Sequence, residues 1–263
     1  MRANIVIKFF LFTYIWSFSL WALTIFTSDS LDGPFSYGTY ILGGLAPMLF
    51  GLYFSHKDGG RIRLVNLFNS AICPKKIKGK WYLVIFGLVP LATVLAIALF
   101  YILGWGTYDT GSMASLLSNP VSVLSMAMFL LLFGPFPEEL GWRGLAMPQL
   151  VKGMDWARAS VIVGVGWAIW HIPLLFINGT YQNGLLDISS VIVADFFLQF
   201  IALSVLTGWI WHNNGQSVLS AILFHFSTNF YGELLELPPG IMPIRTLIEF
   251  IILFIILLHN KRH

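Results

Sequence analysis

The sequence predicts an all-α polytopic membrane protein with about eight transmembrane helices. Hydrophobic residues make up 57% of the 263 positions, charged residues only 10%, and the mean hydropathy is +0.78. A soluble domain carries about 25% charged residues, so this chain has too few charges to cover a water-facing surface. A secreted disulfide scaffold, a disordered chain and a nucleic-acid-binding domain are therefore excluded.

A helix that crosses the hydrocarbon core of a bilayer needs roughly 20 mostly apolar residues. The predicted spans are 4–26, 38–54, 81–104, 122–148, 159–177, 188–211, 216–234 and 244–259. The second is short, and the fourth is long and interrupted by prolines. The first is unlike a signal peptide, because its apolar run is long, contains Lys8 and precedes no small-residue cleavage pattern. The whole chain, 1–263, is expected to form a single membrane domain.

The placement of charges predicts the orientation of the spans. If the spans alternate, the basic residues of the loops and the two chain ends fall on one side. These residues are Arg2, Lys57, Arg61, Arg63, Lys75, Lys76, Lys78, Lys80, Lys152, Arg158, Lys261 and Arg262. The opposite loops carry Asp29, Asp32, Asp109, Asp187, Glu233 and Glu236. Because Lys and Arg concentrate in cytoplasmic loops, both termini are expected in the cytoplasm.

The segment 55–80 is expected to be a cytoplasmic loop, either solvated or lying on the cytoplasmic leaflet. Its basic residues alternate with apolar ones, as in Arg61-Ile62-Arg63. Compact loops and the lack of a targeting segment favour the plasma membrane of a prokaryote.

Ionisable residues inside a membrane are functional candidates, because a charge is costly there. Lys8 lies near a helix end, where its amine can reach the interface. Arg245 and Glu249 are four residues apart and can pair on one helix face. Asp195 is expected to accept hydrogen bonds from a neighbouring helix. The other polar candidates are Glu138, Glu139, Arg143, His171, His225 and Asn229.

The fourth span contains the run Gly134-Pro135-Phe136-Pro137-Glu138-Glu139. Its prolines remove helix donors and predict a break near Pro135. Glu138 and Glu139 then open a second half-helix, where acids favour the positive end of the helix dipole. Glu139 and Arg143, four residues apart, can form an ion pair. Glu138 is left without an obvious local partner, which indicates a function for this acid.

The fifth and seventh spans each carry a histidine with a second residue four positions away. Trp167 and His171 share a face of the fifth span, and His225 and Asn229 share a face of the seventh. At 1.5 Å per residue, His171 lies roughly 20 Å from the cytoplasmic start of its span, and His225 and Asn229 lie roughly 14 and 20 Å in. These three side chains and Glu138 are therefore expected to line a polar cavity that opens to the cytoplasm and laterally to lipid.

An acid, two imidazoles and an amide allow two kinds of hydrolytic site. In the first, Glu138 and His171 activate a water, and His225 and Asn229 donate to the oxyanion. In the second kind of site, which is the alternative, Glu and His side chains bind a metal ion, with zinc as the candidate. No cofactor or metal is expected, because Asn229 is a poor ligand for transition metals and the zincin spacing is absent. No serine nucleophile motif appears, and the single cysteine, Cys73, lies in a loop.

Three motifs, in order along the chain, resemble those of the CPBP family, also called the Abi family. They are Glu138-Glu139-x-x-x-Arg143, Trp167-x-x-x-His171 and His225-x-x-x-Asn229. The family includes type II CAAX prenyl proteases and bacteriocin-processing or self-immunity proteins, and its second motif more often has Phe where this chain has Trp167. The resemblance implies an eight-helix intramembrane glutamic endopeptidase, with a catalytic core at about 122–234. By motif position the catalytic residues are Glu138, His171, His225 and Asn229, and the supporting residues are Glu139, Arg143 and Trp167.

The resemblance also implies a membrane-associated substrate, either a prenylated CAAX-type protein or a leader peptide, with membrane lipid as a further partner and no nucleic acid. Two alternatives remain open. A proton-coupled transporter or a channel also uses acids and histidines in the membrane, although the two halves of the sequence show no matching pair of broken helices. A non-catalytic bacteriocin self-immunity protein would tolerate the loss of Glu138.

Overall fold

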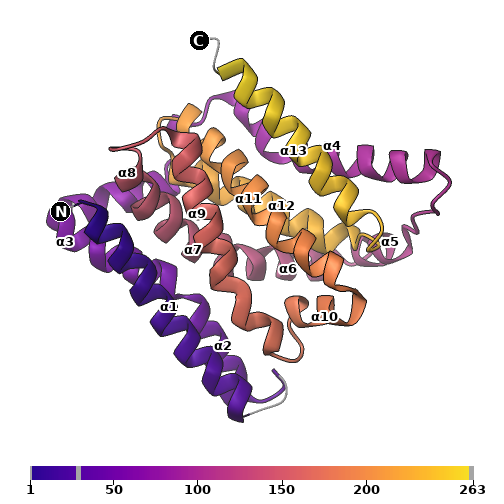
Figure 1. The fold of residues 1–263 in the computed structure, drawn as a ribbon, viewed down its shortest axis with the longest axis horizontal. Helices are drawn as coiled ribbons and strands as arrows, with labels where there is room; N and C mark the ends of the chain where they lie inside the picture. The colour runs from indigo at the N-terminus through magenta and orange to yellow at the C-terminus, as the bar shows by residue number, and fades with distance from the viewer. Residues whose placement is uncertain (1, 28–30, 261–263) are drawn as a thin grey trace.

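The computed structural model describes residues 2–27 and 31–260, and these residues contain helices and no strand (Figure 1). The α-helices are α1 (Arg2–Thr27), α2 (Pro34–Gly44), α3 (Ala46–Ile72), α4 (Gly79–Ile102), α5 (Gly111–Leu117), α6 (Pro120–Phe133), α7 (Pro135–Gly141), α8 (Met147–Leu150), α9 (Trp156–His171), α10 (Tyr181–Ile188), α11 (Ser190–Asn213), α12 (Val218–Leu235) and α13 (Met242–Asn260). The shorter segments are the 3₁₀ turns η1 (Pro74–Lys76) and η3 (Ile172–Phe176) and the π-helical η2 (Trp142–Ala146). The predicted all-α class is confirmed.

Seven helical stretches of the described chain are long and apolar enough to cross a membrane. They are Asn4–Thr27, Pro34–Ile72, Gly79–Ile102, Pro120–Leu150, Trp156–Phe176, Ser190–Asn213 and Met242–His259. Each overlaps one predicted span, and the protein is a multi-pass membrane protein. The remaining predicted span, 216–234, is the helix α12, which is less apolar because it carries His225, Asn229 and Glu233. Of the charges used to predict orientation, Asp29, Lys261, Arg262 and the side chain of Arg2 lie outside the described residues.

The segment 55–80 is largely helical, which agrees with the predicted alternative of a stretch that lies on a membrane leaflet and not with a solvated loop. Helix α3 continues to Ile72 across Gly59 and Gly60, whose backbone angles are not helical. Gly60 has φ +61°, a conformation that glycine adopts without strain, so the chain bends there and resumes its helix. Beyond the bend, exposed apolar side chains recur on one helical face, at Ile62, Val65, Phe68 and Ile72. This pattern is typical of a helix that lies on a membrane surface.

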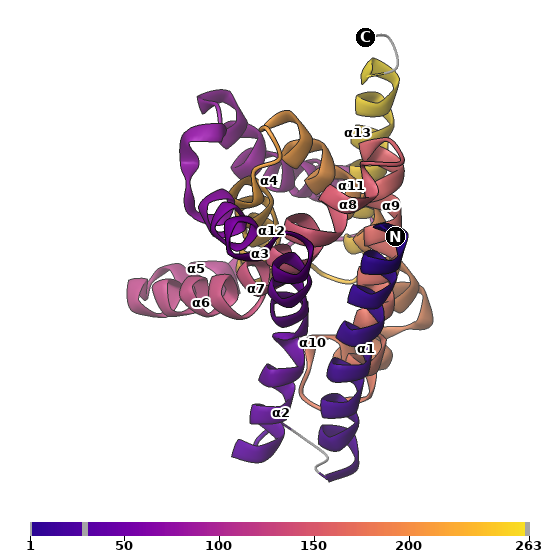
Figure 2. The same cartoon turned by 90° about the vertical axis from the view of Figure 1, so that its left-hand side faces the viewer.

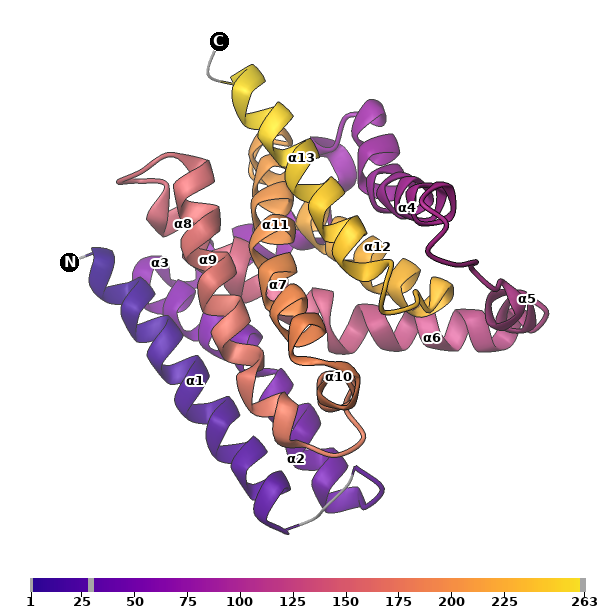
Figure 3. The same ribbon diagram turned by 45° about the vertical axis from the view of Figure 1, so that its right-hand side comes forward.

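The long helices form a bundle with α1 and α2 along one flank and α4 and α13 along the other (Figure 1). Helices α9 and α11 pack against each other between these flanks, and α12 contacts both α11 and α4. Helices α5 and α6 project sideways from the bundle (Figures 2 and 3). Helix α6 has no buried residue and touches the rest of the protein mainly through α5, α7 and α12. The bundle therefore places α7, α9, α11 and α12 around a common centre.

The fourth predicted span is broken, as its prolines predict. The break lies at Gly134, with φ −123° and ψ −96°, and α7 begins at Pro135. Proline suits the first position of a helix, because the N–H that it lacks would have no partner there. Glu138 lies in the first turn of α7, so the predicted second half-helix is confirmed.

Close packing of α7 against α3 depends on a residue without a side chain. A Cβ atom on Gly141 would lie 2.5 Å from the carbonyl oxygen of Pro47, and one on Gly51 would lie 2.8 Å from the Cα atom of Gly141. Small residues let helix backbones approach closely inside a membrane. This contact holds the helix that carries both glutamates against the N-terminal half of α3.

A second group of polar residues joins α11 to α13, away from the three motifs. Thr246 donates a hydrogen bond to Asp195 at 3.2 Å, and Gln199 donates to Glu249 at 3.2 Å. Arg245 and Glu249 form an ion pair, with Nε and Oε1 3.6 Å apart. The predicted hydrogen bond to Asp195 from a neighbouring helix and the predicted pair between Arg245 and Glu249 are both present.

Candidate active site

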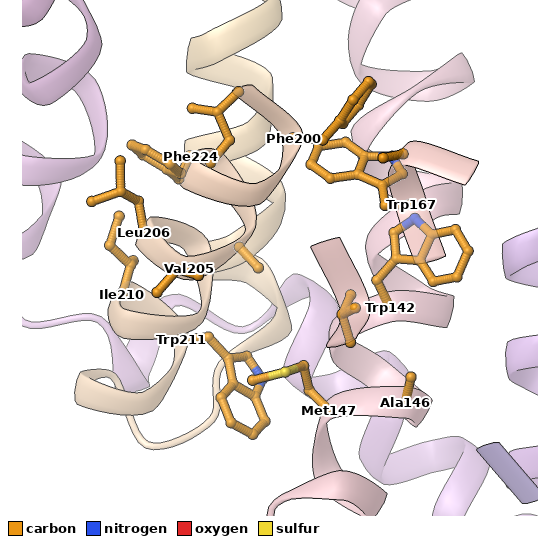
Figure 4. Close-up of a cluster of buried hydrophobic side chains, with 14 of the residues drawn as sticks. Trp142, Ala146, Met147, Trp167, Phe200, Val205, Leu206, Ile210, Trp211 and Phe224 are labelled. Carbon is orange, nitrogen blue, oxygen red and sulfur yellow. The ribbon is translucent and has the colours of Figure 1, made fainter. Parts of the chain in front are cut away.

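Glu138 is buried at the start of α7 and has two indole partners. Its Oε2 atom accepts a hydrogen bond from Nε1 of Trp167 on α9 at 2.6 Å and a longer one from Nε1 of Trp142 at 3.5 Å. The prediction that Glu138 lacks a local partner was therefore wrong, since Trp142 is four residues further along the same chain segment. Tryptophan offers a donor and no acceptor, so both contacts suit a carboxylate. Figure 4 shows Trp142 and Trp167 next to each other, with Phe200 against Trp167.

Glu139 faces different partners from its neighbour. Its Oε1 atom accepts a hydrogen bond from Nη1 of Arg143 at 2.9 Å, which confirms the predicted ion pair. The same oxygen lies 3.0 Å from Nδ1 of His225 on α12. Nη2 of Arg143 donates to the backbone oxygen of Ser204 on α11 at 3.1 Å and to its hydroxyl at 2.9 Å. Glu139 and Arg143 therefore join three helices through buried charge-assisted hydrogen bonds.

His171 ends α9, one turn after Trp167. Its Nδ1 atom lies 2.9 Å from the backbone oxygen of Trp167. A carbonyl oxygen can only accept, so Nδ1 carries the proton, and in the neutral ring Nε2 is free to act as a base. The rings of Phe200 and Trp170 pack against the imidazole with centroids 4.4 and 4.8 Å away. The imidazole is thus held in one orientation.

His225 and Asn229 lie one turn apart on α12 and reach the site from its other side. The ring of His225 packs against that of Trp167, with centroids 4.8 Å apart. Asn229 lies at the break between α6 and α7, where a Cβ atom built on Gly134 would be 3.4 Å from its Nδ2 atom. The break therefore lets the amide approach the backbone just ahead of Glu138.

The fold brings the three sequence motifs together around Trp167. Its indole contacts Glu138, and its ring centroid lies 4.8 Å from that of His225 and 6.0 Å from that of His171. The side chains are almost enclosed, with 7% of Glu138, 7% of His171 and 4% of His225 exposed. The polar cavity predicted at this place stays a prediction.

The donor set does not resemble a metal centre. Within residues 2–27 and 31–260, no three His, Cys, Asp or Glu side chains form a group that could hold a metal ion. The nearest acids and imidazoles already bind one another or an indole, as Glu139 does with His225 and Glu138 with Trp167. The expected lack of a metal stays a prediction.

Sequence reasoning missed two residues of this site. Trp142 follows Glu138 by four residues, the same spacing that predicted the pair between Glu139 and Arg143, so that signal was present. Ser204 carries no local signal, because it is 61 residues from Arg143 and only the packing of α11 against α9 brings it close. Ser204 also donates to the backbone oxygen of Ser160 on α9 at 2.8 Å.

Comparisons with known proteins cover the segment that carries these residues. Residues 120–231, from α6 to α12, match the family described as type II CAAX prenyl endopeptidase, Rce1-like. The chain is also 29% identical to CAAX prenyl protease 2 of Methanococcus maripaludis over 255 residues, covering 97% of this chain and 93% of that protein. The fold and these matches define an intramembrane endopeptidase. The matched segment contains all three motifs, so the similarity to the Rce1-like type II CAAX prenyl endopeptidases that they predict is confirmed.

Proposed function

We propose that the protein hydrolyses a peptide bond near the carboxyl terminus of a prenylated, CAAX-type membrane protein, using a water that Glu138 and His171 activate. The observation that carries this proposal is the position of Glu138. Its carboxylate is buried and is held by the indole of Trp167, and Trp167 lies one helical turn before His171 on α9. Such a pair of groups can remove a proton from water inside a membrane.

In the proposed reaction, the water oxygen bonds to the carbonyl carbon of the scissile peptide. The proton that leaves the water passes to the Glu138 carboxylate, and Nε2 of His171 accepts a hydrogen bond from the remaining water proton. The tetrahedral intermediate then collapses, and the carbon–nitrogen bond breaks. Glu138 returns its proton to the leaving nitrogen, so one water yields a carboxylic acid and an amine, and transfer of the acid's remaining proton to the amine gives a carboxylate and an ammonium group.

His225 and Asn229 supply the oxyanion site in this scheme. The Nδ2 group of Asn229 donates to the developing negative oxygen, and so does Nε2 of His225 when it carries a proton. Nδ1 of His225 already faces the Glu139 carboxylate at 3.0 Å and can donate to it, which fixes the direction of the ring. Glu139 and Arg143 therefore act by holding His225 and α12 in place, and they do not touch the substrate.

The proposed substrate class is supported by the name of a related protein and by the position of the site among membrane-spanning helices. The relative in Methanococcus maripaludis is a CAAX prenyl protease, and the candidate site of this chain lies within helices that cross a membrane. A prenyl chain would remain among lipid tails while the adjoining peptide reaches Glu138 laterally. We place the site on the cytoplasmic side of a prokaryotic plasma membrane, with both termini cytoplasmic, because the basic loops favour that orientation.

The proposed reaction needs no metal, because the groups that would bind zinc are engaged with one another and Asn229 is a poor ligand for it. Zinc remains the alternative, in which a bound ion would activate the water.

Cleavage of a farnesylated CAAX peptide by the purified protein in lipid vesicles tests the proposal. We expect hydrolysis by the wild type and at least a hundredfold loss in Glu138→Gln, the size typical of a removed general base. The same peptide without its farnesyl group is the control for substrate class. Equal cleavage of both peptides would favour a leader-peptide substrate, and full activity of Glu138→Gln would show that another group activates the water.

A further inference from the structure

We propose that the indole N–H of Trp167 positions Glu138 for catalysis in this protein, by holding one carboxylate oxygen and leaving the other for the water. This inference rests on the proposed function, because it assigns Glu138 the role of activating that water. It makes Trp167 a positioning residue, which acts through Glu138.

The two indoles meet the same oxygen. Trp167 donates to Oε2 of Glu138 at 2.6 Å, and Trp142 donates to that oxygen at 3.5 Å. Among the described residues, no hydrogen bond engages Oε1. The 2.6 Å contact is short for N–H···O, as is usual when the acceptor is charged, so Trp167 is the main anchor. One oxygen of Glu138 is thereby fixed, and the other is left for a water.

The ring that supplies this N–H is itself held on several sides. The guanidinium carbon of Arg143 lies 5.6 Å from its centroid, and the rings of Phe200 and His225 lie 4.6 and 4.8 Å from it. Only 3% of the Trp167 side chain is exposed. Turning the indole would displace these neighbours, so the direction of its N–H is set by packing.

The chemistry of the donor gives this contact an effect beyond packing. An indole N–H can donate and cannot accept, so it stabilises an ionised carboxylate more than the neutral acid. Phenylalanine, the residue more often found here in the similar motifs, would keep the aromatic contacts and remove the donor. Replacing Trp167 with Phe therefore separates the hydrogen bond from the packing.

Other charged and titratable groups face Glu138 from the elements around it, and they stay in place in such a variant. Glu139 and Arg143 interact with it electrostatically from its own segment, His225 from α12, and Tyr40 from α2. A change in the pH dependence of Trp167→Phe would therefore report the missing indole donor.

The test compares pH–rate profiles of wild type, Trp167→Phe and Trp170→Phe in vesicles with a farnesylated CAAX peptide. Trp170 is the matched control, since it lies on the same helix, is also 3% exposed, and donates its indole N–H to the hydroxyl of Ser17 at 2.7 Å. In Trp167→Phe, we expect the acid limb of the kcat–pH profile to move roughly one pH unit higher. A shift of that size corresponds to the loss of one charge-assisted hydrogen bond to the carboxylate. Trp170→Phe keeps an aromatic ring beside His171 and leaves the contacts of Glu138 unchanged, so we expect a lower thermal midpoint and an acid limb at the wild-type pH.

An acid limb that stays in place in folded Trp167→Phe would overturn the proposal and leave Trp167 with a packing role. So would equal displacement in both variants. If Trp167→Phe does not fold, Trp167→Leu also lacks the donor and must show the same displacement. Failure of the proposed function would be recognised by a different result, namely full activity of the Glu138→Gln variant.

Discussion

The carboxylate of Glu139 lies 3.0 Å from Nδ1 of His225, across the contact between α7 and α12. Both side chains are buried, and the oxygen concerned also binds Arg143 at 2.9 Å. Glu138, the next residue in the chain, points to the indoles of Trp142 and Trp167 instead. Adjacent residues on a helix project about 100° apart, so two neighbouring acids meet different partners. These different partners support the proposed division of roles, in which Glu139 has a structural role and Glu138 a chemical one.

Loss of the Glu139 carboxylate should therefore destabilise the protein. Glu139→Gln leaves Arg143 buried without its counter-ion, and breaking a buried ion pair costs roughly 3–5 kcal/mol. We expect a clearly lower thermal midpoint in detergent, together with weaker activity because His225 loses its partner. The double variant Glu139→Gln/Arg143→Met removes the stranded charge and should recover part of the stability. A Glu139→Gln protein as stable as Glu138→Gln would contradict this division of roles.

Replacement of Gly141 should disturb the packing of α7 against α3. A Cβ there would lie 2.5 Å from the carbonyl oxygen of Pro47, so Gly141→Ala forces the helices apart at a cost of roughly 1–3 kcal/mol. Gly87 on α4 is the matched control, because a Cβ there meets no atom within 4 Å. Gly87→Ala should leave the thermal midpoint unchanged or raise it, since alanine favours a helix by roughly 0.5–1 kcal/mol. Equal effects of the two substitutions would argue against the close contact.

Activity should survive removal of metal ions. Purified protein treated with a strong chelator is expected to cleave a farnesylated peptide at the untreated rate, because Asn229 is a poor metal ligand and the nearby acids have other partners. Metal content measured by mass spectrometry before and after chelation provides the check. Stoichiometric zinc that leaves together with activity would establish the metal-dependent alternative.

Access to the site should be from the cytoplasmic side. Thr228→Cys or Phe226→Cys, each beside His225 in a Cys73→Ser background, should react with a membrane-impermeant thiol reagent supplied to that side of the membrane. Water needs a polar path to reach these residues, and the basic loops predict that this path starts in the cytoplasm. Labelling only from the extracellular face would contradict this prediction and indicate a site that opens to the outside.

Local features of the sequence were sufficient for much of the fold. The broken helix around Pro135 and the pair between Glu139 and Arg143 follow from proline chemistry and from helical spacing, and both are present. The helix beyond Gly60 was missed, because basic residues among the apolar ones resemble a loop when only hydropathy is considered. The helix α10 was missed because it is short and no long apolar run marks it.

The sequence by itself determined that the chain is an all-helical membrane protein with three polar motifs on separate helices. Hydropathy and a repeat of four residues depend only on neighbours along the chain, so they can be read without a fold. Only the tertiary structure decided that Trp167 donates to Glu138 and that Glu139 faces His225. Those contacts join residues 29 and 86 positions apart, and they depend on how α9 and α12 pack around α7. The direction of a buried hydrogen bond is set by such packing, which no local pattern encodes.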